Sequence, residues 1–361
     1  MRRRTLIAAA SAAALLLAGC ANTPQPDAGE LAIGTLAAPL PDGVALLRSA
    51  RGAPQLVTAR GQARIEQPVI ANDARTRFQV GSISKWITTV AVLRLMDQGK
   101  IDLDQPVTAY LPELPPAIRA VTVRHLLSNT SGIPNGVAAA LRQDRAAVEA
   151  LRISPLEGAL RFGNGIPAFE PGTKFDYSFN NWVIVGGIVE RVTGEPFQQV
   201  IERLVLRPSG VRDTGFADDG WERLPHAALA YDKEKSRRKL PVQIPMVAAS
   251  GTIYSTAADL VAIADTVYAG DLLSGKARKE LLTVQYAAED YALGGRVRDI
   301  GTGAGRRKVV WNSGVSNGFK SLLVYDPADG AAVVLLNNTD IEQSDQRRLA
   351  ETLLDKLLQG R

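Results

Sequence analysis

The chain has 361 residues, of which 46% are hydrophobic, with one cysteine, two histidines and a formal net charge of +5. This length and apolar content suit one large two-lobed domain or two domains. A single cysteine excludes a disulfide within the chain, and basic runs such as Arg306-Arg307-Lys308 are too short for a nucleic-acid surface. His125 and His226 lie far apart, so we expect no metal site and no cofactor.

The first residues are typical of an export signal. Arginines at positions 2–4 precede an apolar run over residues 6–17, which is too short to span a membrane. The run ends at Leu17-Ala18-Gly19-Cys20, where small residues before a cysteine resemble the cleavage box of bacterial lipoproteins. This resemblance implies a signal peptide over residues 1–19 and a lipid on Cys20. The alternative is a plain signal peptide with an incidental cysteine.

Loss of the signal peptide lowers the formal charge from +5 to +2, because it holds three arginines and no acid. We expect a periplasmic lipoprotein, anchored to the outer membrane because no aspartate follows Cys20, that contacts the membrane through its lipid alone. Residues 20–40 contain several prolines and little patterned hydrophobicity, so they are predicted to form a tether.

Beyond the tether, strand patterns lie near both ends of the chain and helical patterns fill the middle. Strands are predicted at residues 43–48, 55–60, 251–254, 308–311, 319–325 and 331–337. Helices are predicted at residues 83–98, 107–111, 123–127, 137–160, 183–192 and 342–359, with one more beginning at Ser255 or Thr256. Residues 41–104 and 247–361 are therefore predicted to form a sheet lobe, and residues 105–246 a helical lobe inserted into it.

A serine and a lysine three residues apart stand at the start of the helix predicted from residue 83. Gly81 permits a tight turn there, and the Ser82 hydroxyl is expected to cap the helix. Residues three apart share a helix face, so Ser82 and Lys85 point the same way. A serine hydroxyl needs a base beside it to act as a nucleophile, and burial favours the uncharged lysine that can serve as one. The alternative is a helix cap followed by an ordinary surface lysine.

A Ser-His-Asp triad is less well supported. It needs a histidine beside the serine, and only His125 and His226 are present. His125 lies at the start of an apolar helix, where packing or hydrogen bonding is the more common role. We expect no G-x-S-x-G nucleophile elbow around any serine, Ser82 included, so lysine-assisted chemistry is the better interpretation.

Several stretches, taken in chain order, resemble one known family. They are Phe78–Lys85, Val121–Pro134, Glu170–Ser178, Val185–Gly194, Ala249–Leu260 and Gly318-Phe319. Together they resemble serine β-lactamases and penicillin-binding-protein-like enzymes, in the branch that includes class C β-lactamases, D-aminopeptidases, D-alanyl-D-alanine carboxypeptidases and related esterases. The resemblance covers nearly all of residues 40–340. It implies an α+β fold of the β-lactamase/transpeptidase type: an antiparallel sheet from both chain ends, flanked by helices, with an inserted helical lobe and Ser82 in the cleft between them.

The resemblance also implies roles for individual residues. Ser82 resembles the acylated nucleophile, Lys85 its proton-accepting partner, and Tyr177 the tyrosine that shuttles a proton to the leaving group. The alternative for Tyr177 is a core aromatic residue. The N–H groups of Ser82 and Val315 would form the oxyanion hole. The substrate-binding residues implied are Asn180, Asn312, Ser313 and Gly314, with Gly314 letting a substrate approach the strand.

Two positions depart from the family pattern. The second motif is usually Tyr-x-Asn, and here Phe179 stands in the place of the asparagine, with Asn180 one position later. The third motif is usually Lys-Thr-Gly or His-x-Gly, and here Asn312 takes the cationic position before Ser313 and Gly314. Asn312 can donate a hydrogen bond but supplies no charge to the carboxylate of a penicillin or a D-alanyl terminus. The alternative is that Asn312 is an ordinary residue at a turn or at the end of a strand.

The sequence therefore favours a serine hydrolase of the cell envelope that acts on an ester, amide or lactam carbonyl through a Ser-Lys-Tyr acyl-enzyme mechanism. One alternative is a β-lactamase or D,D-carboxypeptidase specifically. Another is a non-catalytic, penicillin-binding-like envelope protein. The expected partner is a small-molecule or peptidoglycan-derived substrate, with no nucleic acid.

Overall fold

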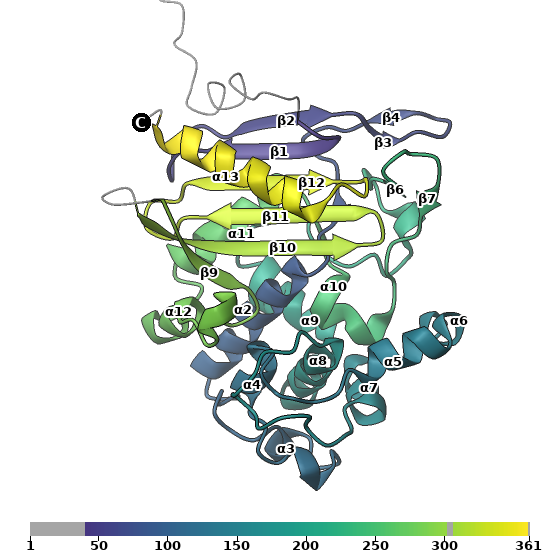
Figure 1. The fold of residues 1–361 in the computed structure, drawn as a ribbon, viewed down its shortest axis with the longest axis vertical. Helices are drawn as coiled ribbons and strands as arrows, with labels where there is room; N and C mark the ends of the chain where they lie inside the picture. The colour runs from purple at the N-terminus through teal and green to yellow at the C-terminus, as the bar shows by residue number, and fades with distance from the viewer. Residues whose placement is uncertain (1–39, 302–305, 360–361) are drawn as a thin grey trace, which may run out of the picture.

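An antiparallel sheet built from both ends of the chain forms one side of the molecule. The computed structural model describes residues 40–301 and 306–359. Its main sheet has six strands in the order β2-β1-β12-β11-β10-β9 (Figure 1). These are β1 Gly43–Arg48, β2 Leu56–Arg60, β9 Arg296–Ile300, β10 Arg307–Ser316, β11 Phe319–Tyr325 and β12 Ala332–Asn337. The fold is thus the predicted α+β arrangement, and strand β1 from the first part of the chain pairs with β12 from its last part.

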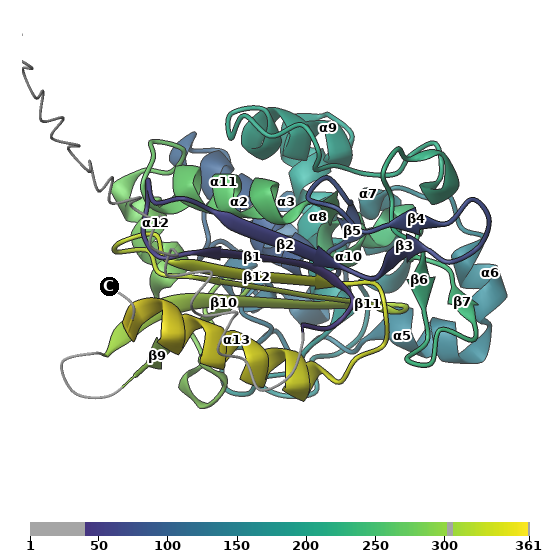
Figure 2. The same ribbon diagram turned by 90° about the horizontal axis from the view of Figure 1, so that it is seen from above.

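The two faces of the sheet are covered by different helices, which is why its central strands are apolar almost throughout. Helix α13 (Gln343–Gln359) packs its leucines on one face, against Leu47, Trp311 and Leu335. Helices α2 (Ile83–Asp97) and α11 (Ala257–Tyr268) cover the other face, as Figure 2 shows from above. Successive residues of a strand point to opposite faces, so Leu46 and Leu47 enter different cores.

The remaining helices gather on the α2 side of the sheet (Figure 1). They are α3 Val107–Tyr110, α4 Val123–Leu127, α5 Gly136–Gln143, α6 Arg145–Glu149, α7 Pro155–Phe162, α8 Phe179–Thr193, α9 Phe197–Ile201, α10 Ala248–Gly251 and α12 Gly275–Leu282. Three short strand pairs complete the fold: β3 Gln62–Arg64 with β4 Ile70–Ala71, β5 Phe78–Gln79 with β8 Tyr254–Ser255, and β6 Ala230–Tyr231 with β7 Arg238–Lys239.

Two predicted elements differ from the structure. The helix expected over residues 137–160 is three helices, because Asp144 caps α6 and Ser154 caps α7, whose first residue is a proline. The prediction of a strand over residues 251–254 is wrong for its first half. Residues 248–251 form helix α10, and strand pairing begins only at Tyr254.

The predicted signal peptide, Cys20 and all but the last residue of the tether lie outside the described residues. Within the described part, no helix combines the length and hydropathy that crossing a bilayer requires.

A partly buried ion pair joins the sheet to its covering helix. Arg48 on β1 is only 3% exposed, and its guanidinium donates to both carboxylate oxygens of Asp265 on α11, each at 2.7 Å. The Tyr325 hydroxyl on β11 donates to the same carboxylate at 2.8 Å. Burial acts to raise the pKa of Asp265, but the hydrogen bonds from Arg48 and Tyr325 outweigh it and leave the pKa below its ordinary value.

Asp265→Asn should lower the free energy of unfolding by about 2–4 kcal/mol, because it leaves the Arg48 charge buried without its partner. The depressed pKa means that the pair stabilises the fold above the unfolded-state pKa of about 4 and loses this contribution as the pH falls through the folded-state value. Urea unfolding between pH 7 and pH 3 tests both points. The free energy of unfolding of the wild type should lose the contribution of the ion pair as the pH falls. The variant lacks the pair, so its free energy of unfolding should show no such loss.

The exposed i,i+4 pair Arg145–Glu149 provides the matched control. Glu149→Gln should change the free energy of unfolding by no more than about 0.5 kcal/mol. Equal effects of the two substitutions would contradict the role given to the Arg48–Asp265 pair.

Candidate active site

Ser82 stands where the chain turns from β5 into helix α2. Gly81 before it has φ +51°, a conformation that L side chains rarely adopt, and a Cβ there would lie 2.7–2.9 Å from the backbone of Val315. Both conformation and space therefore require glycine. Ser82 is the N-cap residue of α2, but its hydroxyl makes no capping hydrogen bond, contrary to the sequence prediction. The hydroxyl is engaged by two other side chains instead.

Lys85 is one of these partners. Its side chain is fully buried, and Nζ donates to Ser82 Oγ at 3.1 Å and to the Ser250 carbonyl on α10 at 2.8 Å. Nζ also lies 4.9 Å from the centre of the Tyr177 ring. Among the described residues, no carboxylate pairs with Lys85. The lysine is therefore held by dipoles and aromatic faces and not by a counter-ion, which is the setting in which an amine can exchange a proton with the serine.

Tyr177 is the second partner, and its hydroxyl donates to Ser82 Oγ at 2.7 Å. Tyr177 lies just before α8, whose N-cap Ser178 accepts a hydrogen bond from the Asn180 backbone N–H. This cap fixes the backbone next to the tyrosine. With 41% of its side chain exposed, Tyr177 borders open space and is not a core aromatic residue. The structure thus brings Ser82, Lys85 and Tyr177 together from α2 and from the segment before α8.

The far wall of the site is the end of strand β10. Strand β9 pairs with β10 only from Arg307 to Trp311, so residues 312–316 run beyond it and leave that edge of the sheet open. Asn312, Ser313 and Val315 line the same cleft as Ser82. The backbone of Gly81 lies against that of Val315, so Ser82 and Val315, the two residues predicted to form the oxyanion hole, lie close together beside the cleft. The Ser82 N–H has no hydrogen-bond partner within the described residues.

Asn312 is 4% exposed, although it borders the cleft. Its Oδ1 lies against Gly295, where any side chain would overlap it. Its Nδ2 finds no hydrogen-bond acceptor among the described residues. Asn312 therefore has a buried, unpaired and uncharged donor at the position where the family pattern has a cation.

Two residues predicted to bind substrate do not lie in the cleft. Asn180 is fully buried, with Oδ1 accepting from the Val137 N–H at 2.9 Å and Nδ2 donating to the Phe162 carbonyl. Its amide joins α8 to α5 and α7, so the prediction for Asn180 is corrected to a packing role. Gly314 is also buried, and a Cβ there would overlap the Val80 carbonyl. Its lack of a side chain admits the neighbouring backbone, and not a substrate as predicted.

One G-x-S-x-G sequence does occur, over residues 314–318, although the sequence analysis expected none. Ser316 ends strand β10 just before the hairpin to β11, and it is buried with its hydroxyl donating to the Gln79 side chain. A nucleophile elbow joins a strand to a helix and exposes its serine, so this match has no such role. His125 likewise serves the fold, since its Nδ1 accepts from the Thr122 N–H in a capping box.

The cleft over Ser82 has a volume of about 440 Å³. Aromatic rings make up much of its lining, and Phe175, Phe179 and Tyr291 belong to it together with Tyr177. The sequence analysis did not assign Phe175 or Tyr291 to the site. Phe175 lies inside the motif over residues 170–178, so its place in the motif was the available signal. Tyr291 lies in a segment without a recognised motif, and only the fold brings it to the cleft.

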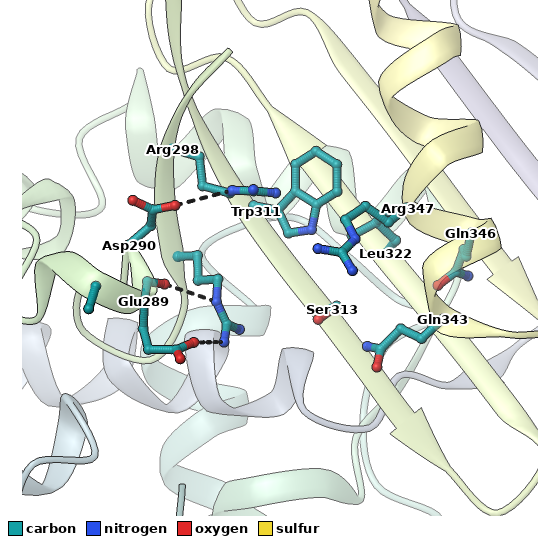
Figure 3. A pocket seen from close by; sticks show the side chains of 11 residues that line it. Glu289, Asp290, Arg298, Trp311, Ser313, Leu322, Gln343, Gln346 and Arg347 are labelled. Carbon is teal, nitrogen blue, oxygen red and sulfur yellow. Dashed lines mark hydrogen bonds and ion pairs between the residues drawn. The ribbon is translucent and has the colours of Figure 1, made fainter. Parts of the chain in front are cut away.

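A neighbouring hollow of about 340 Å³ is lined on one side by residues of α13 (Figure 3). It shares Trp311, Ser313 and Gln343 with the cleft. Arg298 and Arg347 extend over Trp311 from opposite sides in Figure 3. Two of the hollow's arginines are paired, Arg296 with Glu289 at 2.9 Å and Arg298 with Asp290 at 3.4 Å, and the structure records no partner for Arg347 within the described residues.

The described part of the chain contains no group of three or more His, Cys, Asp or Glu side chains arranged to hold a metal ion.

Comparison with known proteins agrees with this arrangement. The family described as Beta-lactamase matches residues 35–357. PbpX of Bacillus subtilis, which is named for penicillin binding, is 28% identical over 79% of this chain and 68% of its own length. Esterase EstB of Burkholderia gladioli is 35% identical over 47% of this chain and 46% of its own. The crystal structure of a penicillin-binding protein from Bacillus halodurans matches with a TM-score of 0.74 and 25% identity, covering 86% of this chain and 95% of that one. The chain belongs to the Beta-lactamase family.

Proposed function

We propose that this protein is a serine hydrolase in which Ser82 forms an acyl-enzyme with an ester, amide or lactam carbonyl. The observation that carries the proposal is the pair of hydrogen bonds at Ser82 Oγ, from Lys85 Nζ at 3.1 Å and from the Tyr177 hydroxyl at 2.7 Å, beside an open cleft. A hydroxyl held between an amine and a phenol has both a proton acceptor and a proton donor within reach.

The proposed reaction has two halves. As Oγ bonds to the carbonyl carbon, the hydroxyl proton passes to the Lys85–Tyr177 pair, and the oxyanion is stabilised by the N–H groups of Ser82 and Val315. The tetrahedral intermediate then expels the alcohol or amine, which takes a proton from Tyr177. Water attacks the acyl-enzyme in the second half, with the same pair accepting its proton and returning one to Ser82.

The retained Ser-Lys-Tyr set favours an enzyme over a non-catalytic binding protein. Within the enzymes, Asn312 disfavours a β-lactamase or D,D-carboxypeptidase specifically, because an amide offers no charge to the carboxylate of those substrates. The esterase among the relatives gives independent support for an ester substrate. An anchor through a lipid on Cys20 and a place in the periplasm are part of the proposal, and they rest on the sequence of residues 1–20 alone.

Ser82→Ala should abolish covalent labelling and turnover. We expect one adduct in the intact mass of the full-length wild type, in mild detergent, after exposure to a fluorophosphonate, and none on the variant. Hydrolysis of 4-nitrophenyl acetate by the variant should fall to the buffer rate. Ser344→Ala, on the exposed side of α13, is the control and should behave as wild type. Turnover that survives in Ser82→Ala would refute the nucleophile.

Lys85→Met should separate catalysis from stability. Methionine nearly fills the space of the lysine, so the buried core stays packed, while the base is lost. We expect kcat/KM to fall by about 10²–10⁴-fold. The melting temperature should stay the same or rise, because a buried amine without a carboxylate partner is costly to the fold. A variant that loses stability and keeps its activity would show that Lys85 is a structural residue.

A further inference from the structure

Among the described residues that line the cleft, Arg296 is the one with a charged side chain. Its Nη2 lies 2.9 Å from a carboxylate oxygen of Glu289, and its Nε donates to the Glu289 carbonyl at 3.1 Å. Its guanidinium also lies 5.4 Å from the centre of the Tyr291 ring. Lys85 is fully buried, and its Nζ is hydrogen-bonded to Ser82 Oγ and to the Ser250 carbonyl. An anionic group placed against the cleft lining would therefore lose its hydration without gaining a free counter-charge from that lining.

Aromatic rings gather on one side of this cleft. Phe175, Tyr177 and Tyr291 line it, and we call these three side chains the aromatic wall. The Phe175 ring centre lies 5.0 Å from that of Tyr291 and 6.5 Å from that of Tyr177. Rings at such distances favour the addition of a further ring in an offset or edge-to-face arrangement.

Phe179 extends this surface towards the nucleophile. It is the first residue of α8, directly after the cap at Ser178, so its backbone direction is fixed. Its ring centre lies 5.7 Å from Lys85 Nζ, and 37% of the side chain remains exposed. Val315, which is 46% exposed, lines the same cleft on the β10 side. Ser82 is thus flanked by two apolar side chains that a bound substrate would cover.

We infer that the cleft selects uncharged substrates with an aromatic ring next to the scissile carbonyl, and that Phe179 is the residue that sets this preference. The inference rests on the proposed function and names its substrate class. The ring is covered by Phe179 and the aromatic wall.

Four small esters test the inference in the full-length protein, with proton release followed at constant pH. Methyl phenylacetate and its isomer benzyl acetate place the same ring on the acyl side and on the alcohol side of the carbonyl. Methyl cyclohexylacetate replaces the ring by a saturated one, and monomethyl succinate carries an anion. For the better aromatic isomer, we expect kcat/KM to exceed that for methyl cyclohexylacetate by about 2–10-fold. It should exceed the value for monomethyl succinate by about 10-fold or more.

Substitutions at position 179 assign the preference to one side chain. Phe179→Asn should lower kcat/KM for the better aromatic ester by about 10-fold and leave the value for monomethyl succinate unchanged or higher. Phe179→Leu should keep the preference for uncharged esters and lose the advantage of the aromatic over the saturated ring. Ile166→Asn, at an exposed apolar residue outside the cleft, is the matched control and should change neither ratio.

The main competing source of specificity is the arginine-lined hollow in Figure 3. Arg347 there could hold an anionic substrate that reaches across Ser313 and Gln343. Monomethyl succinate as the best ester, with a loss of that activity in Arg347→Gln, would overturn the inference. Ester ratios that Phe179→Asn leaves unaltered would overturn it as well.

Fluorophosphonate labelling of Ser82 keeps this test separate from that of the proposed function. A labelled serine together with equal rates on all four esters would reject the substrate class and leave the hydrolase in place. A serine that is not labelled, in a protein that hydrolyses none of the esters, would reject both.

Discussion

The site depends on a close approach between two stretches of backbone, the turn before α2 and the end of strand β10. Gly81 and Gly314 have no side chains at the points where these stretches meet. The Val80 carbonyl accepts from the Ser321 hydroxyl of β11 at 2.7 Å, and the Val80 N–H donates to the Ile253 carbonyl at 2.9 Å. Ser82 is therefore placed by close backbone packing against the end of β10, with support from the Ser321 hydroxyl of the same sheet.

Electrostatics at the site follow from the same packing. The apolar helix α2 has no room for a carboxylate beside Lys85, and the space around its amine is filled by Ser82, the Ser250 carbonyl and aromatic faces. The Arg48–Asp265 pair between β1 and α11 is, by contrast, a complete ion pair. The fold thus contains a complete ion pair, Arg48–Asp265, where it joins the sheet to a helix. Lys85 has no carboxylate partner among the described residues, and it lies where proton transfer is proposed.

Much of the fold could be predicted because its signals are local. Strands such as β1 and β11 alternate between two apolar cores, and the Ser82 helix ends within one residue of its predicted limit at Gln98. The motif around Tyr177 singled out a residue whose hydroxyl lies 2.7 Å from Ser82 Oγ. Asn180 could not be predicted in the same way, because its burial depends on α5 and α7, which are distant in sequence. The breaks at Asp144 and Ser154 did have local signals, namely capping residues within an apparently continuous helix.

The pairing of β1 with β12 has a consequence for how the catalytic centre comes into being. Ser82 lies in the first third of the described chain, whereas β10, β11 and β12 all come from its last part. Contacts between such distant segments form late and slow the folding of a domain. During synthesis, a chain that already contains the serine, lysine and tyrosine still lacks Val315 and the wall of the cleft. The proposed site is therefore complete only when nearly the whole polypeptide has folded, and a prematurely terminated chain carries the Ser82 hydroxyl without the Val315 N–H that we propose for the oxyanion.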